Sequence, residues 1–218
     1  MSKNTIVGII IASLIVFAVG YYIYRDVTGP AIDTGDTNAT STTSTPTSTV
    51  QNIPPKPVVS APLLPKAPTI DRPILFTDST PKEMQESMRK EIGNIALSLK
   101  TDGTNFNNWM DLGLLRHTIG DYEGAREAWE YASALRPKNS ISFSNLGNVY
   151  GYYLKDAAKA EKNLLQAIAN DTKLVYLYMQ TYDFYRDVLK DSVKAKGIIE
   201  KGVAVTGDDQ LKKFLTEL

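Results

Sequence analysis

The sequence contains no cysteine and only one histidine among its 218 residues. Without cysteine, the chain forms no disulfide, no thiolate metal site and no thiol nucleophile. With His117 as its single histidine, it has no multi-histidine metal site. Lysine plus arginine and aspartate plus glutamate both number 24, so the formal net charge is zero. A nucleic-acid-binding protein usually has a basic patch or stripe, whereas the charges here are interspersed. We therefore expect no nucleic-acid partner.

Sequence motifs of catalysis are also missing. There is no glycine-rich phosphate loop, no Gly-x-Ser-x-Gly motif and no spacing typical of metal ligands. A lone histidine on a helix, such as His117, is far more often a polar surface or groove residue than a catalytic base. The Asp208-Asp209 pair is most simply explained as helix-start residues that complement the helix dipole. We therefore predict that the protein is not an enzyme and has no catalytic residue, cofactor or metal.

Residues 5–24 form a long apolar run without a charged residue, TIVGIIIASLIVFAVGYYIY. At about 1.5 Å per residue, a helix of this length spans about 30 Å, the thickness of a bilayer core. Three tyrosines at its C-terminal end suit the membrane interface. A cleaved signal peptide would have a shorter apolar run and small residues before the cleavage site. The sequence therefore predicts an uncleaved single-pass membrane anchor within residues 1–26.

The charges beside this run predict its orientation. Lys3 and the amino terminus precede it, whereas Arg25 follows it and is offset by Asp26. The positive-inside rule then places the amino terminus in the cytoplasm and the rest of the chain outside, in the cell envelope.

Residues 27–79 have the composition of a linker. Serine and threonine dominate from Thr37 to Thr49, and prolines recur from Asn52 to Pro73. Such stretches cannot bury a core, and their composition favours disorder and extended polyproline II conformation. We predict a disordered spacer over 27–79. Its final apolar patch, Ile74-Leu75-Phe76, is a candidate to dock on the first helix of the domain that follows.

Residues 80–218 have helical periodicity and no alternating strand pattern. The clearest stretch is WMDLGLLRHTIGDYEGAREAWEYASALRPKN, from Trp109 to Asn139. Small residues stand where two helices must cross closely, large residues fill the remaining space, and a Gly-Asp pair ends the first helix. This pattern resembles the tetratricopeptide repeat (TPR), a helix-turn-helix unit of 34 residues. The resemblance implies an all-α fold built as a short TPR-like α-solenoid.

The same pattern recurs twice along the chain. We assign residues 106–139 and 140–172 to two repeats, 173–207 to a degenerate third repeat, and 208–218 to a capping helix. The second repeat has one extra residue in its turn. The third has Tyr182 where the others have a glycine, so we expect a looser or rotated helix pair there. The predicted packing residues are Trp109, Leu112, Gly113, Tyr122, Ala125, Trp129, Ala132, Pro137, Phe143, Leu146, Gly147, Tyr150, Ala160, Leu164, Ala167, Tyr178, Tyr185 and Ala195.

Stacked helical repeats form an extended concave surface, which in TPR proteins is lined by the first helix of each pair. Carried over position by position, the resemblance implies a groove lined by Met110, Leu114, His117, Asn148, Tyr152, Tyr176, Met179, Asp183 and Arg186. Some family members bind a C-terminal carboxylate with lysine and asparagine on this face. Met110 and Leu114 replace residues of that clamp, so a carboxylate clamp is not expected.

Two functions fit these features. The first is a membrane-anchored scaffold whose repeats bind a protein or peptide of unknown identity outside the cytoplasm. The second is a structural envelope protein that self-associates and has no peptide-binding groove.

Overall fold

The computed structural model describes residues 64–76 and 80–218. Within these ranges the chain forms eight α-helices and no β-strand, which confirms the all-α class for this part of the chain. No helix in these ranges is both long and apolar enough to cross a bilayer. The predicted membrane anchor and residues 27–63 and 77–79 of the predicted linker lie outside the described residues.

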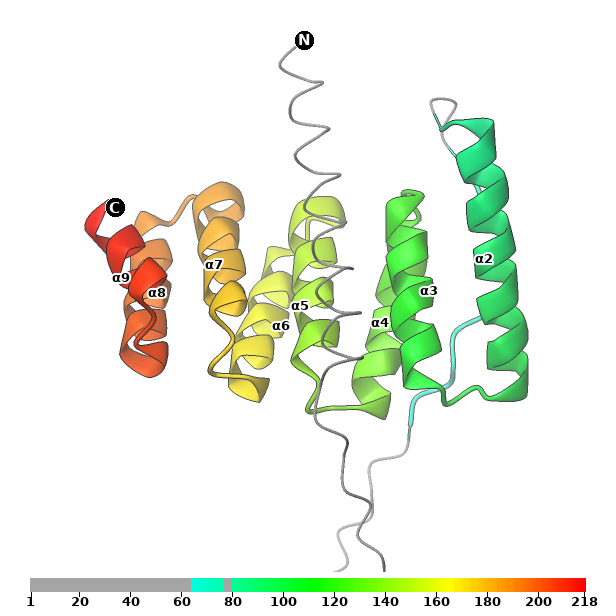
Figure 1. The fold of residues 1–218 in the computed structure, drawn as a ribbon, viewed down its shortest axis with the longest axis horizontal. Helices are drawn as coiled ribbons and strands as arrows, with labels where there is room; N and C mark the ends of the chain where they lie inside the picture. Colours follow the sequence, from blue (N-terminus) through cyan, green and yellow to red (C-terminus); the bar gives the residue numbers. More distant parts are fainter. Residues whose placement is uncertain (1–63, 77–79) are drawn as a thin grey trace, which may run out of the picture. The chain divides into compact units, whose positions relative to one another are not determined.

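Each helix packs against the next along the chain, so residues 82–216 form a row of antiparallel neighbours (Figure 1). Contact is most extensive between α3 and α4 and between α5 and α6, and it is less extensive between α7 and α8. The helices are α2 (Lys82–Thr101), α3 (Phe106–Thr118), α4 (Tyr122–Leu135), α5 (Ser140–Asn148), α6 (Ala157–Asn170), α7 (Val175–Phe184), α8 (Ser192–Thr206) and α9 (Asp209–Thr216).

Asparagine and aspartate side chains fix where most of these helices begin. Asp121, Asp156 and Asp191, each 35 residues apart, cap the second helix of the three pairs by accepting a hydrogen bond from a backbone N–H three residues later. Asn105 and Asn139 cap the first helix of the first two pairs in the same way. Regular capping explains why the helix boundaries recur at nearly constant spacing.

The extra residue of the second and third pairs is accommodated in π-helical turns. One more residue lies between Phe143 and Asp156 than between Trp109 and Asp121. The first helices of these two pairs, α5 and α7, continue into the π-helical turns η1 (Val149–Tyr153) and η2 (Tyr185–Leu189), and α3 does not. A π turn holds one more residue than an α turn, so it takes up the insertion.

The first two pairs are built around a glycine on the first helix. A Cβ added to Gly113 would lie 2.3 Å from the indole nitrogen of Trp129, and one added to Gly147 would lie 2.5 Å from Cγ of Leu164. Trp129 also donates a 3.1 Å hydrogen bond from its indole N–H to the carbonyl of Met110. The bulky side chain of the second helix therefore packs directly on the backbone of the first.

The third pair reverses this arrangement. The large side chains belong to the first helix, where Tyr178 is fully buried and Tyr182 is 7% exposed. The close approach comes from the second helix, because a Cβ added to Gly202 would lie 2.9 Å from Tyr178. The side chains of this pair are thus packed differently from those of the other two, and its helices contact each other less.

Most of the predicted packing residues are buried. Tyr122 and Phe143 are half-buried, Pro137 is exposed, and all the others lie in the core. Their burial follows from the apolar periodicity that singled them out.

The two ends of the row are built differently. At the C-terminal end, Leu211 of α9 is buried and the ring of Phe214 contacts that of Tyr182 at 5.0 Å. At the N-terminal end, residues 64–76 form neither helix nor strand, and residues 68–76 of this stretch lie against α2, α3 and α4 (Figure 1). The sequence predicts a disordered linker up to residue 79 in which only Ile74-Leu75-Phe76 docks on the first helix, whereas contact with the helices begins at Pro68. Of the apolar patch, Ile74 and Phe76 pack against the core, whereas Leu75 is exposed.

Candidate functional site

The candidate groove residues all lie on the first helices of the three pairs or on the π turns that end them. α3 carries Met110, Leu114 and His117; α5 and η1 carry Asn148 and Tyr152; α7 and η2 carry Tyr176, Met179, Asp183 and Arg186. Their exposure differs widely. Met110 is only 9% exposed, Leu114 is 38% exposed and Tyr176 is 56% exposed. The face is therefore accessible mainly through residues other than Met110.

An acidic and aromatic cluster forms where η1 meets α7 and η2. It consists of Tyr152, Asp183, Arg186 and Asp187. The Arg186 guanidinium lies 2.8 Å from an Asp183 carboxylate oxygen and donates from Nε to Asp187 at 2.7 Å. The same guanidinium stacks over the Tyr182 ring, 5.2 Å from its centre. The cluster holds two carboxylates and one guanidinium, so its formal charge is negative.

The environment of this cluster changes the pKa values of its members. Burial, together with the nearby Asp183 and Asp187 carboxylates, raises the pKa of the half-buried Tyr152 to about 12. Burial also raises the pKa of Asp183, opposed by Arg186. A half-desolvated carboxylate beside a phenol is a site where a hydrogen-bond donor or cation gains more than it would in open water.

A second polar contact joins α5 to α7 beside the cluster. Ser144 Oγ donates a 2.6 Å hydrogen bond to Gln180 Oε1, and Gln180 Nε2 donates a 3.3 Å bond to the Ser144 carbonyl. Both residues are buried, at 1% and 9% exposure. These reciprocal bonds hold α5 and α7 at a fixed separation, which in turn fixes where Tyr152 and Asp183 lie.

His117 belongs to a different cluster. Its ring lies 4.8 Å from that of Tyr153 and 5.4 Å from that of Tyr122, both edge-to-face, and 5.8 Å from the Trp129 ring. Tyr122 and Tyr153 stack on each other at 4.0 Å. The His117 Nε2 atom is buried and has no hydrogen-bond partner in the described part of the chain. Burial lowers the pKa of His117, which favours the neutral imidazole.

The sequence did not single out Tyr153 as a contact of His117. Tyr153 lies in η1, next to the predicted groove residue Tyr152, and it is 39% exposed. The π turn determines which of the two tyrosines faces the first pair. A pattern counted in regular helical turns cannot identify that residue.

Three other tyrosines have structural hydrogen bonds. Tyr178 donates to the Thr172 carbonyl at 2.9 Å, Tyr185 donates to Glu161 at 3.0 Å, and the Tyr150 hydroxyl bonds to Glu130. Burial raises the pKa of all three. With their rings in the core and their hydroxyls engaged, these residues connect helices and do not line a binding surface.

The described residues contain no group of three or more histidine, aspartate, glutamate or cysteine side chains that could hold a metal ion. The face formed by α5, α7 and their π turns offers hydrogen-bonding, charged and aromatic side chains, the kinds of group found at protein interfaces. The sequence matches no protein-family model and no curated protein.

Proposed function

We propose that this chain is a membrane-anchored TPR-like scaffold protein whose helical domain binds a protein or peptide outside the cytoplasm. Support comes from two levels. The sequence provides the predicted anchor, the linker and the spacing of 34 to 35 residues between equivalent positions. The fold adds three consecutive helix pairs with equivalent caps at Asp121, Asp156 and Asp191. Such stacking leaves the first helices available as an extended surface.

The observation that carries the proposal is the cluster of Tyr152, Asp183, Arg186 and Asp187. Tyrosine supplies a large contact area at low conformational cost, and it is enriched where proteins bind each other. Tyr176, 56% exposed at the start of α7, adds another aromatic ring on the first helix of the third pair. The excess of carboxylate over guanidinium favours a partner segment with lysine, arginine or other hydrogen-bond donors.

Site-specific photo-crosslinking in cells tests this assignment. A photoreactive residue at position 176 should form an adduct with the partner, whereas one at Leu165, 39% exposed on α6, should not. Tyr152→Ala and Asp183→Asn should each reduce the adduct at 176, because they remove the aromatic and acidic contacts. Glu86→Gln, an exposed change on α2, is the matched control and should leave it unchanged. Equal adducts at 176 and 165, or adducts insensitive to both substitutions, would contradict the proposal.

Exposed apolar residues at the two ends of the row favour a second candidate function, self-association. At one end Met84 and Leu97 of α2 are 47% and 65% exposed, and at the other Val193 and Leu218 are 82% and 49% exposed. Val193 and Leu218 line one shallow groove together with Tyr182 and Arg186. Copies that pack end to end would cover these side chains. Sedimentation of the detergent-solubilised full chain distinguishes the two functions: a monomer at all concentrations excludes association through these ends.

The predicted location has its own test, which the absence of cysteine makes simple. A single cysteine introduced at Thr42 should react with a membrane-impermeant maleimide in intact cells if the linker lies outside the cytoplasm. A cysteine at Ser2 should react only after the membrane is permeabilised. The opposite pattern would place the helical domain inside the cell.

A further inference from the structure

Residues 68–76 lie on the helices as an extended peptide with two distinct sides. Its even-numbered residues, from Pro68 to Phe76, are half-buried, and the odd-numbered residues between them are all exposed. Successive side chains of an extended chain point to opposite sides, so this alternation is the signature of one face held against a surface. We call residues 68–76 the docked segment.

A buried arginine binds the backbone of the docked segment. The Arg116 side chain is 2% exposed, and its guanidinium donates to the carbonyls of Arg72 and Pro73, both at 2.7 Å. The guanidinium also forms an ion pair with Asp121, at 3.2 Å. A buried guanidinium is costly unless its donors are paired. Without the docked segment, Arg116 would lose two of these partners at once.

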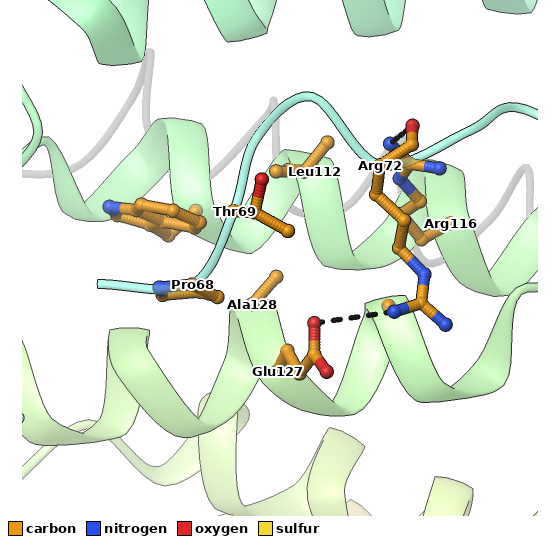
Figure 2. A pocket seen from close by; sticks show the side chains of 9 residues that line it. Pro68, Thr69, Arg72, Leu112, Arg116, Glu127 and Ala128 are labelled. Carbon is orange, nitrogen blue, oxygen red and sulfur yellow. Dashed lines mark hydrogen bonds and ion pairs between the residues drawn. The ribbon is translucent and has the colours of Figure 1, made fainter. Parts of the chain in front are cut away.

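The helices also bind the side chains of the docked segment according to their charge. Arg72 Nε lies 2.8 Å from an Asp121 oxygen, and its Nη1 lies 3.5 Å from Glu127. The preceding Asp71 lies 3.0 Å from Lys100 Nζ at the end of α2. Figure 2 shows the Arg72 side chain extending over α4 to Glu127, with the peptide backbone passing above the helices. Asp71 thus pairs with a basic residue of the helices, and Arg72 pairs with two acidic residues.

Apolar contacts flank this polar centre on both sides. Before it, Pro68 and Thr69 line one side of a small cavity, and its other side includes the apolar Trp109, Leu112 and Ala128 as well as charged residues of the polar centre (Figure 2). After it, Ile74 and Phe76 pack against the core. Arg89 of α2 stacks 4.8 Å from the centre of the Phe76 ring and donates to the Ile74 carbonyl at 3.2 Å. The contacts therefore extend along the whole docked segment.

We propose that the surface formed by α2, α3 and α4 is a recognition site for an extended peptide, and that its ligand is the chain's own Asp-Arg-Pro segment at residues 71–73. The site is separate from the proposed partner-binding face, because it uses Arg116 and Leu112 of α3, whereas the groove candidates occupy other positions. Attachment in cis is favoured because Phe76 precedes α2 by only a few residues, which gives the ligand a high effective concentration. The linker thus binds the domain through residues 71–73, which contact Arg116 and precede the start of α2 at Lys82.

Cysteine labelling of the full chain tests this proposal, since the natural sequence has no cysteine. A thiol at Ile74, on the bound side, should react far more slowly than one at Leu75, which is 75% exposed. Adding Arg72→Ala should accelerate labelling at position 74 by roughly tenfold to a hundredfold, the factor for losing a charged hydrogen bond. Labelling at position 75 should not change. Arg72→Lys keeps the charge but loses the planar set of guanidinium donors. Its labelling rate at position 74 should therefore lie between the rate with Arg72 and the rate with Arg72→Ala.

Two controls separate undocking from unfolding. Arg186→Ala deletes an equally charged side chain that makes no contact with the docked segment, and it should leave labelling at position 74 unchanged. Helical circular dichroism should be the same for all variants at the labelling temperature. Equal labelling rates at positions 74 and 75, or no effect of Arg72→Ala, would overturn the proposal.

Dilution identifies whose segment is bound. Protection of position 74 should be independent of protein concentration if the ligand belongs to the same chain. Protection that falls on dilution would show that a second copy supplies the segment, and would overturn the assignment in cis.

Discussion

The first two helix pairs and the third solve the same packing problem in opposite ways. In the first two, a glycine on the first helix receives a large side chain from the second, as Gly113 receives Trp129. In the third, the first helix carries Tyr178 and Tyr182, and Gly202 on the second helix makes the close approach. One small residue on either helix is therefore enough for a close crossing. The helix that does not carry the glycine supplies the large buried side chains of the pair.

This reversal is tested most strongly by truncating the aromatic residues that occupy equivalent positions. Tyr178→Ala should lower the free energy of unfolding by about 3–5 kcal/mol, because it empties a fully buried site and removes the bond to the Thr172 carbonyl. Phe143→Ala, at the equivalent and half-buried position of the second pair, should cost roughly 0.5–3 kcal/mol. Urea unfolding measures both. Equal losses would mean that the two pairs are packed alike after all.

Adding a methyl group at the glycines tests the crossing itself. Gly113→Ala and Gly147→Ala should each destabilise the domain by about 1–3 kcal/mol, because the added Cβ overlaps Trp129 or Leu164. Gly197→Ala is the matched control on α8, where an added Cβ has no neighbour within 4 Å. There the change should stabilise by about 0.5–1 kcal/mol through helix propensity. An unchanged stability of the Gly113→Ala variant would show that the Trp129 side chain can shift at little energetic cost.

The first pair differs from the second in carrying a titratable group, His117, where the second has Gly151. The pKa of folded His117 lies below its ordinary value of about 6.5. In the pH window just below 6.5 the unfolded chain therefore binds more protons than the folded chain. The free energy of unfolding should fall as the pH drops through that window.

The measurement is the melting temperature between pH 7.5 and 5.5, compared with that of His117→Gln. Burial raises the pKa of Tyr153, whose ring packs against His117, so Tyr153 does not titrate in this range and the difference between the two curves isolates the histidine. Parallel curves would show that His117 is protonated equally in both states.

The smallest expected effect concerns the turns between helices. The first pair turns at Gly120 with φ +85°, whereas the second and third turn at Lys155 and Lys190 with φ 58° and 55°. A side chain in this left-handed region costs about 1 kcal/mol relative to glycine. Lys155→Gly should therefore stabilise the domain by up to about 1 kcal/mol in thermal unfolding, and Gly120→Ala should destabilise it by a similar amount. A destabilising Lys155→Gly would indicate that the 2.6 Å bond from Lys155 Nζ to the Tyr152 carbonyl matters more.

The helices and most of their buried residues could be predicted because their signals are local. Apolar periodicity placed Leu146 and Leu164 in the core, and the unequal spacing between repeats revealed the inserted residue. The depth of each groove residue could not be predicted in this way. Met110 occupies a position expected to face a ligand, yet it is buried beside Trp129, because counting along a helix does not show how far the next helix reaches over it.

The docked segment could be predicted only at its apolar end, Ile74-Leu75-Phe76, and the reason is a different one. Its prolines and lack of periodicity indicate an extended, unpacked chain, and the extended conformation is indeed what it adopts. The contacts that hold its centre include bonds from a residue more than forty positions away, those from Arg116 to the carbonyls of Arg72 and Pro73. Nothing in the sequence of α3, which carries several other polar residues, marks Arg116 as buried or names its partner.

The π turns have a consequence for how this chain tolerates changes in length. One residue added to a regular helix rotates everything beyond it by about 100°, which would move the following cap and its helix out of position. In η1 and η2 the wider turn takes up that residue, and Asp156 and Asp191 still cap their helices as Asp121 does. The end of each first helix is therefore the place where single insertions and deletions cause the least damage. Deleting one residue from η1 should give the second pair the connection that the first already has.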